Sequence, residues 1–479
     1  MRALAIALAW LTTLSFGGVA QDDALSRYAL DVALDPAART LSGALRLDYV
    51  NDTGQALESV PFLLLANLGS APNPHLHPAL LDAAYPEGFD PSWTVIHAAR
   101  DENGQPLDFA YEPMPPMIQT FSLDEAVLRV TLPRPLAPGA RARIALEFET
   151  HFPHSTNIDA TFYRDTFTWR FGWHPIALGP GFFDDGRLQL RAAWHEATVQ
   201  LPPGYVLAAG ADRQTVLADG QGGQTVALAS DAHTRSIPLA ISPHFQVHTL
   251  RHAAVPIEVY YLPGHAAHAR LAASLAASQI DYFEERFGPF AYRRLTLVDN
   301  PGSQLYCMAA EGMVLVGTDN FRFKDLLIPG LADRLLEWLL AHEVGHLWWG
   351  IGVGADFNAE NWLSEGLAQY LSLRYFEDAY GAFGPNLLGH LGPGLLERLV
   401  QDEFGYLNLR QHQVEVGYLD VFKNRFDEAI VRRAEDVEYG NATVSRTYNK
   451  GYLVARALEG LVGREALEGA LRALHAERV

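Results

Sequence analysis

The chain has 479 residues, and its 36 Lys plus Arg against 56 Asp plus Glu give a formal net charge of −20. Hydrophobic residues make up 49% and charged residues 19%, a composition typical of globular proteins, which excludes a disordered or fibrous chain. The acidic charge argues against nucleic acid as a partner, because phosphate binding depends on clustered cations, and the single cysteine, Cys307, excludes an intrachain disulfide.

Residues 1–20 have the pattern of a signal peptide. Arg2 supplies a positive charge, Ala3–Phe16 form an apolar run of 14 residues, and Gly18–Ala20 are the small residues that a signal peptidase reads. The run is shorter than the ~20 residues that a membrane-spanning helix needs. We therefore expect an exported protein, periplasmic or secreted, with no stable membrane insertion after cleavage. A buried first helix and an uncleaved anchor are the alternatives.

From about residue 25 to residue 250, apolar and polar residues alternate with the period of two that is typical of half-buried strands. Leu45, Leu47 and Tyr49 alternate with charged residues, for example, and a turn follows at Asn51–Gly54. Proline and glycine interrupt the chain at strand-length spacing. We predict that residues 21–250 form an N-terminal all-β domain.

The pattern changes near residue 250. Apolar residues recur at helical spacing in 271–287, and two short apolar strands are expected at 294–298 and 313–316. From 331 to the end the chain is mostly helical. We therefore predict that residues 251–479 form a second domain, mainly helical with a small β-sheet, which makes the fold class α+β.

A short histidine motif carries the strongest chemical signal in the chain. His342-Glu343-Val344-Gly345-His346 lies in a predicted helix, where residues i and i+4 share one face, so both imidazoles can bind one cation. Glu343 is turned about 100° around the helix axis from His342, toward an open coordination position. Glu365, 18 residues beyond His346, is the candidate third ligand.

Two histidines and a glutamate form the ligand set expected of a hydrolytic zinc site, with the fourth position left for water. Such a motif also arises by chance on surface helices, but its helical context and the position of Glu365 favour a zinc site. We predict one Zn²⁺ per chain, held by His342, His346 and Glu365. Glu343 would act as general base toward the water that zinc activates.

These residues resemble those of the gluzincin aminopeptidases, the metallopeptidase family of aminopeptidase N. The family pairs HExxH with a glutamate at the separation of Glu365. The opening strands resemble its N-terminal β saddle, and the segment from Ile257 to Leu295 resembles the entrance to its thermolysin-like catalytic domain. The resemblance implies a hydrolase, a zinc metalloprotease that releases N-terminal amino acids from peptide substrates.

The resemblance also implies roles for two residues outside the histidine motif. Tyr448 matches the family's Tyr-x-Lys-Gly segment, whose tyrosine stabilises the oxyanion. Glu311 matches the glutamate of a Gly-x-Met-Glu-Asn strand that binds the free amine of the substrate, but the glycine and the asparagine are replaced here by Met308 and Gly312. This departure leaves a zinc endopeptidase without selectivity for free amines as the alternative.

Two further questions stay open from the sequence. Only 31 residues follow Tyr448, whereas relatives usually continue through more helices, so either the chain is truncated at its C-terminus or the site is open on that side. A non-catalytic peptide-binding scaffold is the remaining alternative. The preferred side chain at the cleavage point, the physiological substrate and the oligomeric state are not determined by the sequence.

Overall fold

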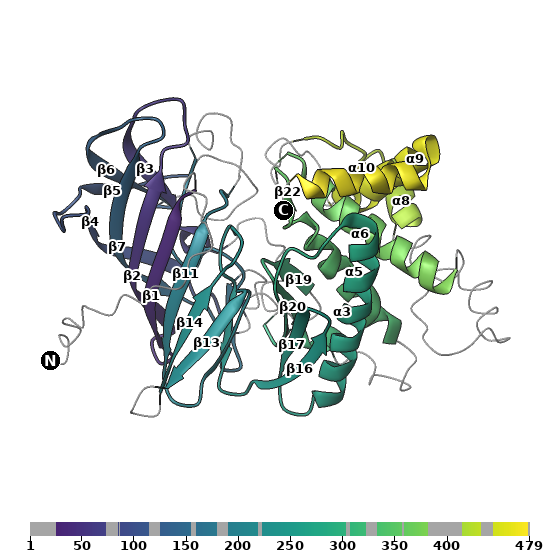
Figure 1. Ribbon diagram of the computed structural model, residues 1–479, viewed down its shortest axis with the longest axis horizontal. Helices are drawn as coiled ribbons and strands as arrows, with labels where there is room; N and C mark the ends of the chain where they lie inside the picture. Colours follow the sequence, from purple (N-terminus) through teal and green to yellow (C-terminus); the bar gives the residue numbers. More distant parts are fainter. Residues whose placement is uncertain are drawn as a thin grey trace.

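The computed structural model describes residues 25–72, 85, 87–114, 125–154, 160–179, 190–218, 223–302, 307–321, 333–356, 359–381, 414–432 and 444–477. The predicted signal peptide lies outside these residues. Figure 1 shows β-sheets in the N-terminal half and, beside them, a C-terminal half with a smaller sheet and helices on the side of it away from the N-terminal half. The predicted α+β class is confirmed.

The largest sheet of the described residues has seven strands in the order β13-β14-β11-β1-β2-β7-β4. Neighbouring strands are antiparallel except β1 and β11, which run parallel. In β1 every second side chain is buried, as the alternation predicts. The strands are β1 (Arg27–Asp35), β2 (Thr40–Val50), β4 (Trp93–Arg100), β7 (Arg141–His151), β11 (Trp194–Leu201), β13 (Arg213–Ala218) and β14 (Gln224–Ala229).

Two four-stranded sheets complete the described part of the N-terminal half. The first has the order β10-β3-β6-β5 and the second the order β12-β15-β9-β8. A 3-10 turn, η1 (Leu65–Gly69), follows β3. The strands are β3 (Leu57–Leu63), β5 (Phe109–Glu112), β6 (Val127–Leu136), β8 (Ala160–Tyr163), β9 (Thr166–Trp169), β10 (Ile176–Ala177), β12 (Val206–Ala209) and β15 (Leu239–Ser242).

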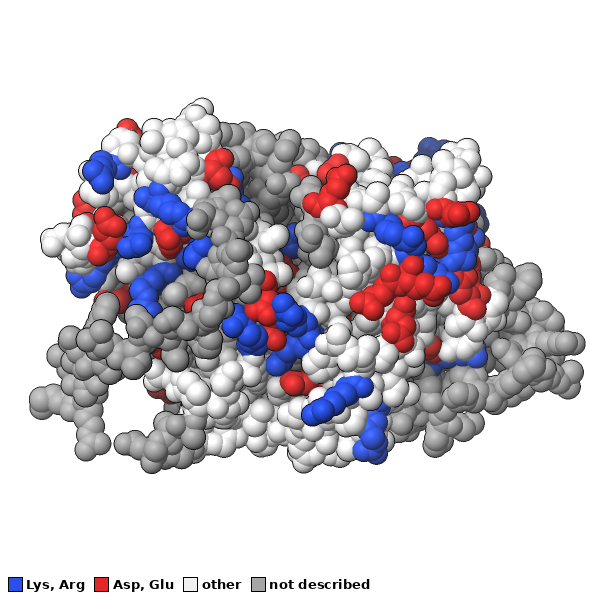
Figure 2. Space-filling view, viewed as in Figure 1, with Lys and Arg blue, Asp and Glu red and all other residues white. Residues whose placement is uncertain are grey.

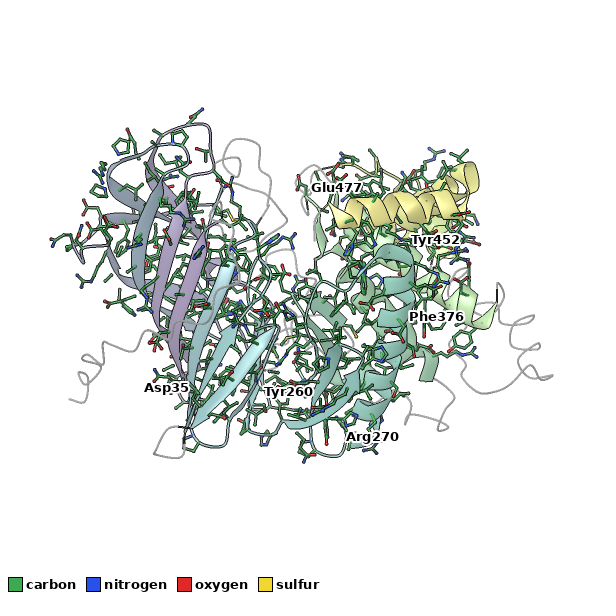
Figure 3. All side chains as sticks on the ribbon, in the orientation of Figure 1. Asp35, Tyr260, Arg270, Phe376, Tyr452 and Glu477 are labelled. Atoms are coloured by element: carbon green, nitrogen blue, oxygen red, sulfur yellow. The ribbon has the colours of Figure 1, made fainter. Side chains whose placement is uncertain are left out.

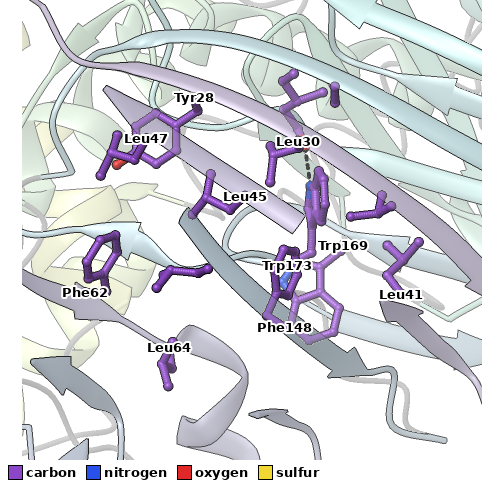
Figure 4. Packing of buried hydrophobic residues seen from close by; sticks show 14 of the residues in the cluster. Tyr28, Leu30, Leu41, Leu45, Leu47, Phe62, Leu64, Phe148, Trp169 and Trp173 are labelled. Carbon is purple, nitrogen blue, oxygen red and sulfur yellow. Dashed lines mark hydrogen bonds between the residues drawn. The ribbon is translucent and has the colours of Figure 1, made fainter. Parts of the chain in front are cut away.

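The core of the N-terminal half takes side chains from all three sheets. Leu45, Phe62 and Trp169 belong to one buried cluster (Figure 4). Complete burial of side chains of this size contributes roughly 1.5–3 kcal/mol each. The indole N–H of Trp173, which is also buried, donates to the carbonyl of Ile237 at 2.7 Å. Trp169 and Trp173 are therefore both buried with their indole N–H groups hydrogen-bonded.

The C-terminal half is built on a five-stranded sheet in the order β16-β17-β18-β20-β19. Strands β17 and β18 are parallel, so the chain needs a long crossover between them, which helix α3 (Ala266–Phe287) provides. Strand β19 lies at the sheet edge, antiparallel to β20. The strands are β16 (Gln246–His252), β17 (Val255–Tyr261), β18 (Leu295–Asn300), β19 (Cys307–Ala310) and β20 (Met313–Gly317).

Helices α3, α4 and α5 contact this sheet, the remaining helices of the described residues pack mainly on other helices, and α3, α5 and α6 lie beside one another in Figure 1. None of the helices in the described residues is long and apolar enough to cross a membrane. The elements are α4 (Thr318–Phe321), α5 (Asp333–His346), β21 (Trp349–Gly350), β22 (Val353–Gly354), α6 (Asn361–Tyr380), α8 (Gly417–Lys423), the π-helical turn η7 (Ser445–Lys450), α9 (Gly451–Val462) and α10 (Arg464–Ala476).

The two halves share a buried apolar cluster and direct polar contacts. Tyr260, which Figure 3 places between them, packs with Ala208 of β12 and Val298 of β18. The hydroxyl of Thr296 donates to the carbonyl of Ala209 at 2.9 Å. On the face drawn in Figure 2, acidic and basic side chains are mixed rather than separated. The change from one sheet system to the next falls between β15 and β16, and the predicted domain division near residue 250 stays a prediction.

Candidate functional site

Helix α5 presents two histidines on one face. His342 and His346 are buried, and their rings lie edge to face with centroids 4.7 Å apart. The opposite side of the helix, with Leu336, Leu340 and Val344, packs into the core of the C-terminal half. This apolar face fixes the rotation of the helix about its axis, so the histidine face points toward α6.

Helix α6 brings Glu365 onto the histidine pair. Glu365 Oε2 lies 3.3 Å from His342 Nε2 and 3.3 Å from His346 Nε2, and the two nitrogens are 3.2 Å apart. Two ligand atoms on a tetrahedral zinc ion, each about 2.0–2.1 Å from the metal, lie about 3.3 Å from each other. The three atoms therefore have the spacing of one face of a zinc tetrahedron.

The orientation of His346 is set by its second ring nitrogen. Nδ1 lies 3.1 Å from the carbonyl of Trp349 and 3.2 Å from the hydroxyl of Ser364. A carbonyl only accepts, so Nδ1 carries a proton, and Nε2 is the nitrogen that can bind a cation once its own proton is released. Nδ1 of His342 is buried, and none of the described residues accepts a hydrogen bond from it.

Opposite charges compensate one another within this cluster. Burial lowers the pKa of His346, but the Glu365 carboxylate outweighs burial and raises that pKa to about 9. Burial likewise raises the pKa of Glu365, but His346 and His342 together hold it well below its usual range. Such mutual compensation is expected of ligands placed to bind a divalent cation.

Glu343 lies beside the ligand cluster and does not belong to it. Its side chain is buried in α5, and the backbone N–H of Ala309, in edge strand β19, donates to its carboxylate. Burial raises the pKa of Glu343, and the neighbouring histidines act in the opposite direction. A raised pKa brings a carboxylate closer to the range in which it can take up and return a proton near neutral pH.

Tyr448 reaches the same cluster from the C-terminal end of the chain. Its ring lies nearly parallel to that of His342, with centroids 5.7 Å apart, and its hydroxyl is hydrogen-bonded to Glu365. Burial, then Glu365 and Glu343, raise the pKa of Tyr448 well above its usual value. The phenol therefore stays protonated and can donate a hydrogen bond.

The close approach of α6 and α9 brings Tyr448 to Glu365. Gly366 follows Glu365 directly, and Gly451 lies three residues beyond Tyr448. A Cβ on Gly366 would lie 2.6 Å from the Cα of Gly451, so neither position has room for a side chain. Our sequence reasoning did not identify these glycines, although each lies within a few residues of a predicted site residue.

Glu311 lies in the turn between β19 and β20 and is buried. The backbone N–H and the guanidinium of Arg235 donate to its Oε1, both at 3.1 Å, and the hydroxyl of Tyr292 donates to Oε2 at 2.7 Å. Gly312, which replaces the family's asparagine, has φ 63°, a conformation that glycine adopts freely and that asparagine tolerates better than most residues. The replacement is therefore compatible with the same turn.

The N-terminal half contributes two arginines to the surroundings of the site that our sequence reasoning missed. Arg235 contacts Glu311, and the positive charge of Arg170 acts to lower the pKa of Tyr448. Arg170 directly follows strand β9. Nothing in the local sequence distinguishes these arginines from others, because their partners are far away along the chain.

Parts of the chain are similar in sequence to known proteins. Residues 271–477 match the peptidase family M1 domain. Aminopeptidase 2 of Candida albicans is 33% identical over 125 residues, and glutamyl aminopeptidase of Bos taurus is 23% identical over 239 residues. These matches cover 25% and 49% of this chain but only 13% and 23% of the two relatives, so the chain spans a small part of their length.

Solved structures resemble the chain over more of its length. An M1 zinc metallopeptidase from Deinococcus radiodurans has a TM-score of 0.61 and 17% identity, covering 95% of this chain and 86% of its own. A variant of a Deinococcus radiodurans M1 zinc metallopeptidase, bound to a Tyr-Ser-Ala substrate, gives a TM-score of 0.61 with 16% identity, covering 95% and 87%. At this identity the likeness establishes a shared fold.

Proposed function

We propose that this chain, whose residues 271–477 match the peptidase family M1 domain, is a zinc-dependent aminopeptidase that releases N-terminal amino acids from peptides. The observation that carries the proposal is the triangle of His342, His346 and Glu365, whose ligand atoms are 3.2–3.3 Å apart. Glu343 and Tyr448 lie at the edge of this triangle, where a proton acceptor and a hydrogen-bond donor are needed.

The residues fit zinc by their chemistry as well as by their spacing. Two imidazole nitrogens and one carboxylate oxygen make a donor set that zinc hydrolases use, and it leaves a fourth position for water. We infer one zinc ion per chain. When bound, zinc lowers the pKa of water and polarises the carbonyl group of the scissile bond.

The chain's own residues would carry out the proton transfers. The Glu343 carboxylate would take a proton from the attacking water and deliver it to the leaving amine. The Ala309 N–H holds that carboxylate in place beside strand β19. The Tyr448 hydroxyl would donate to the oxygen on which negative charge develops, in a buried position where such a bond is strong.

Release of N-terminal residues requires recognition of a free amine, and we assign this to the Glu311 carboxylate. Glu311 is two residues beyond Ala309, on the same turn that borders the general base. A second candidate function, endopeptidase activity without selectivity for a free amine, is favoured by one observation: Arg235 already pairs with Glu311 at 3.1 Å. The two candidate functions, aminopeptidase and endopeptidase, differ only in how the site holds the N-terminus of the substrate.

Three measurements test the proposal. The protein should bind zinc at one ion per chain, and hydrolysis of aminoacyl amides should stop when a chelator removes the metal. The Glu343→Gln variant should keep zinc and lose turnover, because the amide is a poor proton acceptor. A zinc-loaded parent that hydrolyses neither free nor N-acetylated peptides would instead favour a non-catalytic scaffold.

For localisation we propose export to the periplasm or the medium. The proposal rests on the charged start, the apolar run and the small residues of 1–20. Expression of the full chain in a bacterial host and N-terminal sequencing of the periplasmic fraction would test it. A protein that remains in the cytosol with its N-terminus intact would contradict export.

A further inference from the structure

The carboxylate of Glu311 is already occupied by the chain itself. A carboxylate offers about four lone-pair positions, and three donors use those of Glu311: the N–H and the guanidinium of Arg235, and the hydroxyl of Tyr292. The Glu311 side chain is only 10% exposed. Little of its hydrogen-bonding capacity is therefore left for the ammonium group of a substrate.

Arg235 is fixed in this position by the loop that follows the histidine helix. The same Nη1 atom that contacts Glu311 also donates to the carbonyl of Ile351 at 2.6 Å. Gly354, in β22, leaves the space that the guanidinium fills, since a Cβ there would collide with Nη2. Arg235 thus connects the segment before β15, the Glu311 turn and the loop after α5.

The pairing places a fixed positive charge where the substrate's amine has to bind. A guanidinium is charged at every physiological pH and forms its strongest hydrogen bonds with carboxylates. The α-ammonium of a peptide would share one carboxylate with a like charge, and such juxtaposition costs binding energy. An N-acetylated peptide carries no such charge and would not be affected in this way.

We propose that Arg235 is a specificity-determining residue of this peptidase. Its positive charge weakens the preference of Glu311 for a free N-terminus and allows the site to accept peptides with a blocked N-terminus or to cleave at internal positions. The proposal rests on the proposed function, because it takes Glu311 as part of the substrate site. It predicts that removal of the guanidinium charge makes the protein more selective for free amines.

The test measures peptide binding in a variant that is expected to lack turnover. Zinc-loaded Glu343→Gln protein is titrated with a tripeptide and with its N-acetylated form, and the ratio of the two Kd values is compared with that of Glu343→Gln/Arg235→Met. In the double variant we expect the preference for the free peptide over the N-acetylated peptide to be about tenfold greater than in Glu343→Gln. This factor corresponds to about 1.4 kcal/mol. The same shift is expected in the ratio of kcat/KM values for Arg235→Met alone.

Two control variants separate the charge from its structural role. Arg235→Lys keeps the positive charge beside Glu311 and should leave the ratio near that of the parent. Arg213→Met removes another arginine of the N-terminal half, which pairs with Asp231 at 2.7 Å rather than with Glu311. This variant should also leave the ratio of the two Kd values unchanged. Circular dichroism and thermal unfolding establish that each variant folds.

Distinct results would overturn the inference and the proposed function. An unchanged or lowered preference for the free peptide in Arg235→Met, or an equal rise in Arg235→Lys, overturns the role of Arg235. Parent protein that binds zinc but neither peptide, and hydrolyses neither, overturns the proposed function instead. If Arg235→Met fails to fold, Arg235→Gln, which removes the charge but keeps hydrogen-bond donors beside Glu311, supplies the comparison with Arg235→Lys.

Discussion

Gly451 lies directly against Gly366 at the crossing of α9 and α6: a Cβ on Gly451 would be 2.8 Å from the Cα of Gly366. Two hydrogen atoms in place of side chains allow the helices to approach until Tyr448 reaches Glu365. Gly366 and Gly451 are 85 positions apart in the chain. Their contact sets the distance between the predicted oxyanion donor and the predicted metal ligands.

We expect Gly451→Ala to lower kcat by at least about tenfold, because the methyl group would push α9 and Tyr448 away from a helix that holds a metal ligand. Zinc content should not change, since all three predicted ligands lie on α5 and α6. Gly460→Ala is the matched control: it lies in the same helix with nothing within 4 Å, and should only raise helix stability by up to about 1 kcal/mol. Equal activity of both variants would contradict the argument.

Tyr448→Phe tests the phenol itself. The change keeps the ring that packs on His342 and removes the hydroxyl, so we expect kcat to fall by roughly 10²–10³ with little change in KM. Zinc binding should persist. Tyr418→Phe, which removes an exposed hydroxyl bonded to Asp427, is the control and should behave like the parent. A Tyr448→Phe variant with full activity would remove Tyr448 from the mechanism.

Glu365→Gln tests the third ligand. An amide binds zinc far more weakly than a carboxylate, so we expect zinc content after dialysis to fall and chelation to affect thermal unfolding less than in the parent. Zinc at 100 times its Kd should stabilise the parent by about 2.7 kcal/mol. Glu360→Gln, at the start of the same helix and without a side-chain cap bond, is the control. Full zinc retention by Glu365→Gln would exclude Glu365 as a ligand.

Two buried histidines of the N-terminal half predict loss of stability in acid. Burial lowers the pKa of His174 to about 4, and burial together with His174 lowers that of His195 to about 3. In the unfolded chain both titrate near 6.5, so below that pH the unfolded state binds more protons and the free energy of unfolding falls. The free energy of unfolding should begin to fall near pH 6.5 and continue to fall to about pH 4. Each histidine that takes up a proton on unfolding contributes up to about 1.4 kcal/mol per pH unit.

Urea unfolding of the metal-free protein between pH 8 and pH 4.5 measures this dependence. The ring of His195 stacks on Tyr28, with centroids 4.7 Å apart, so His195→Leu keeps an apolar group there and removes one titrating site. We expect the variant to lose less stability per pH unit than the parent. Gln200→Ala, which changes an exposed residue of the same strand that carries no titrating group, should retain the parent's slope. Identical slopes for the parent and His195→Leu would contradict the assignment.

The amino-acid sequence determined the features that depend on local regularity. The alternation around Leu45 predicted strands, and the helical spacing of 271–287 predicted α3, because the period of a segment's apolar residues reflects which face it buries. His342 and His346 were placed on one face by the same rule, which needs only four residues of chain. Glu365 was a candidate ligand from its residue type and its separation from His346, whereas Tyr448 required the resemblance to a family, since no local rule relates it to the histidines.

Only the tertiary structure decided which distant groups meet. Arg235 and Glu311 are 76 residues apart, and their hydrogen bonds exist because β-strand and helical halves pack against each other at Gly210 and Gly354. The approach of Gly366 to Gly451 likewise follows from helix packing rather than from either segment alone. Contacts of this kind depend on shape and on the absence of side chains, properties that become defined only when the elements are in place.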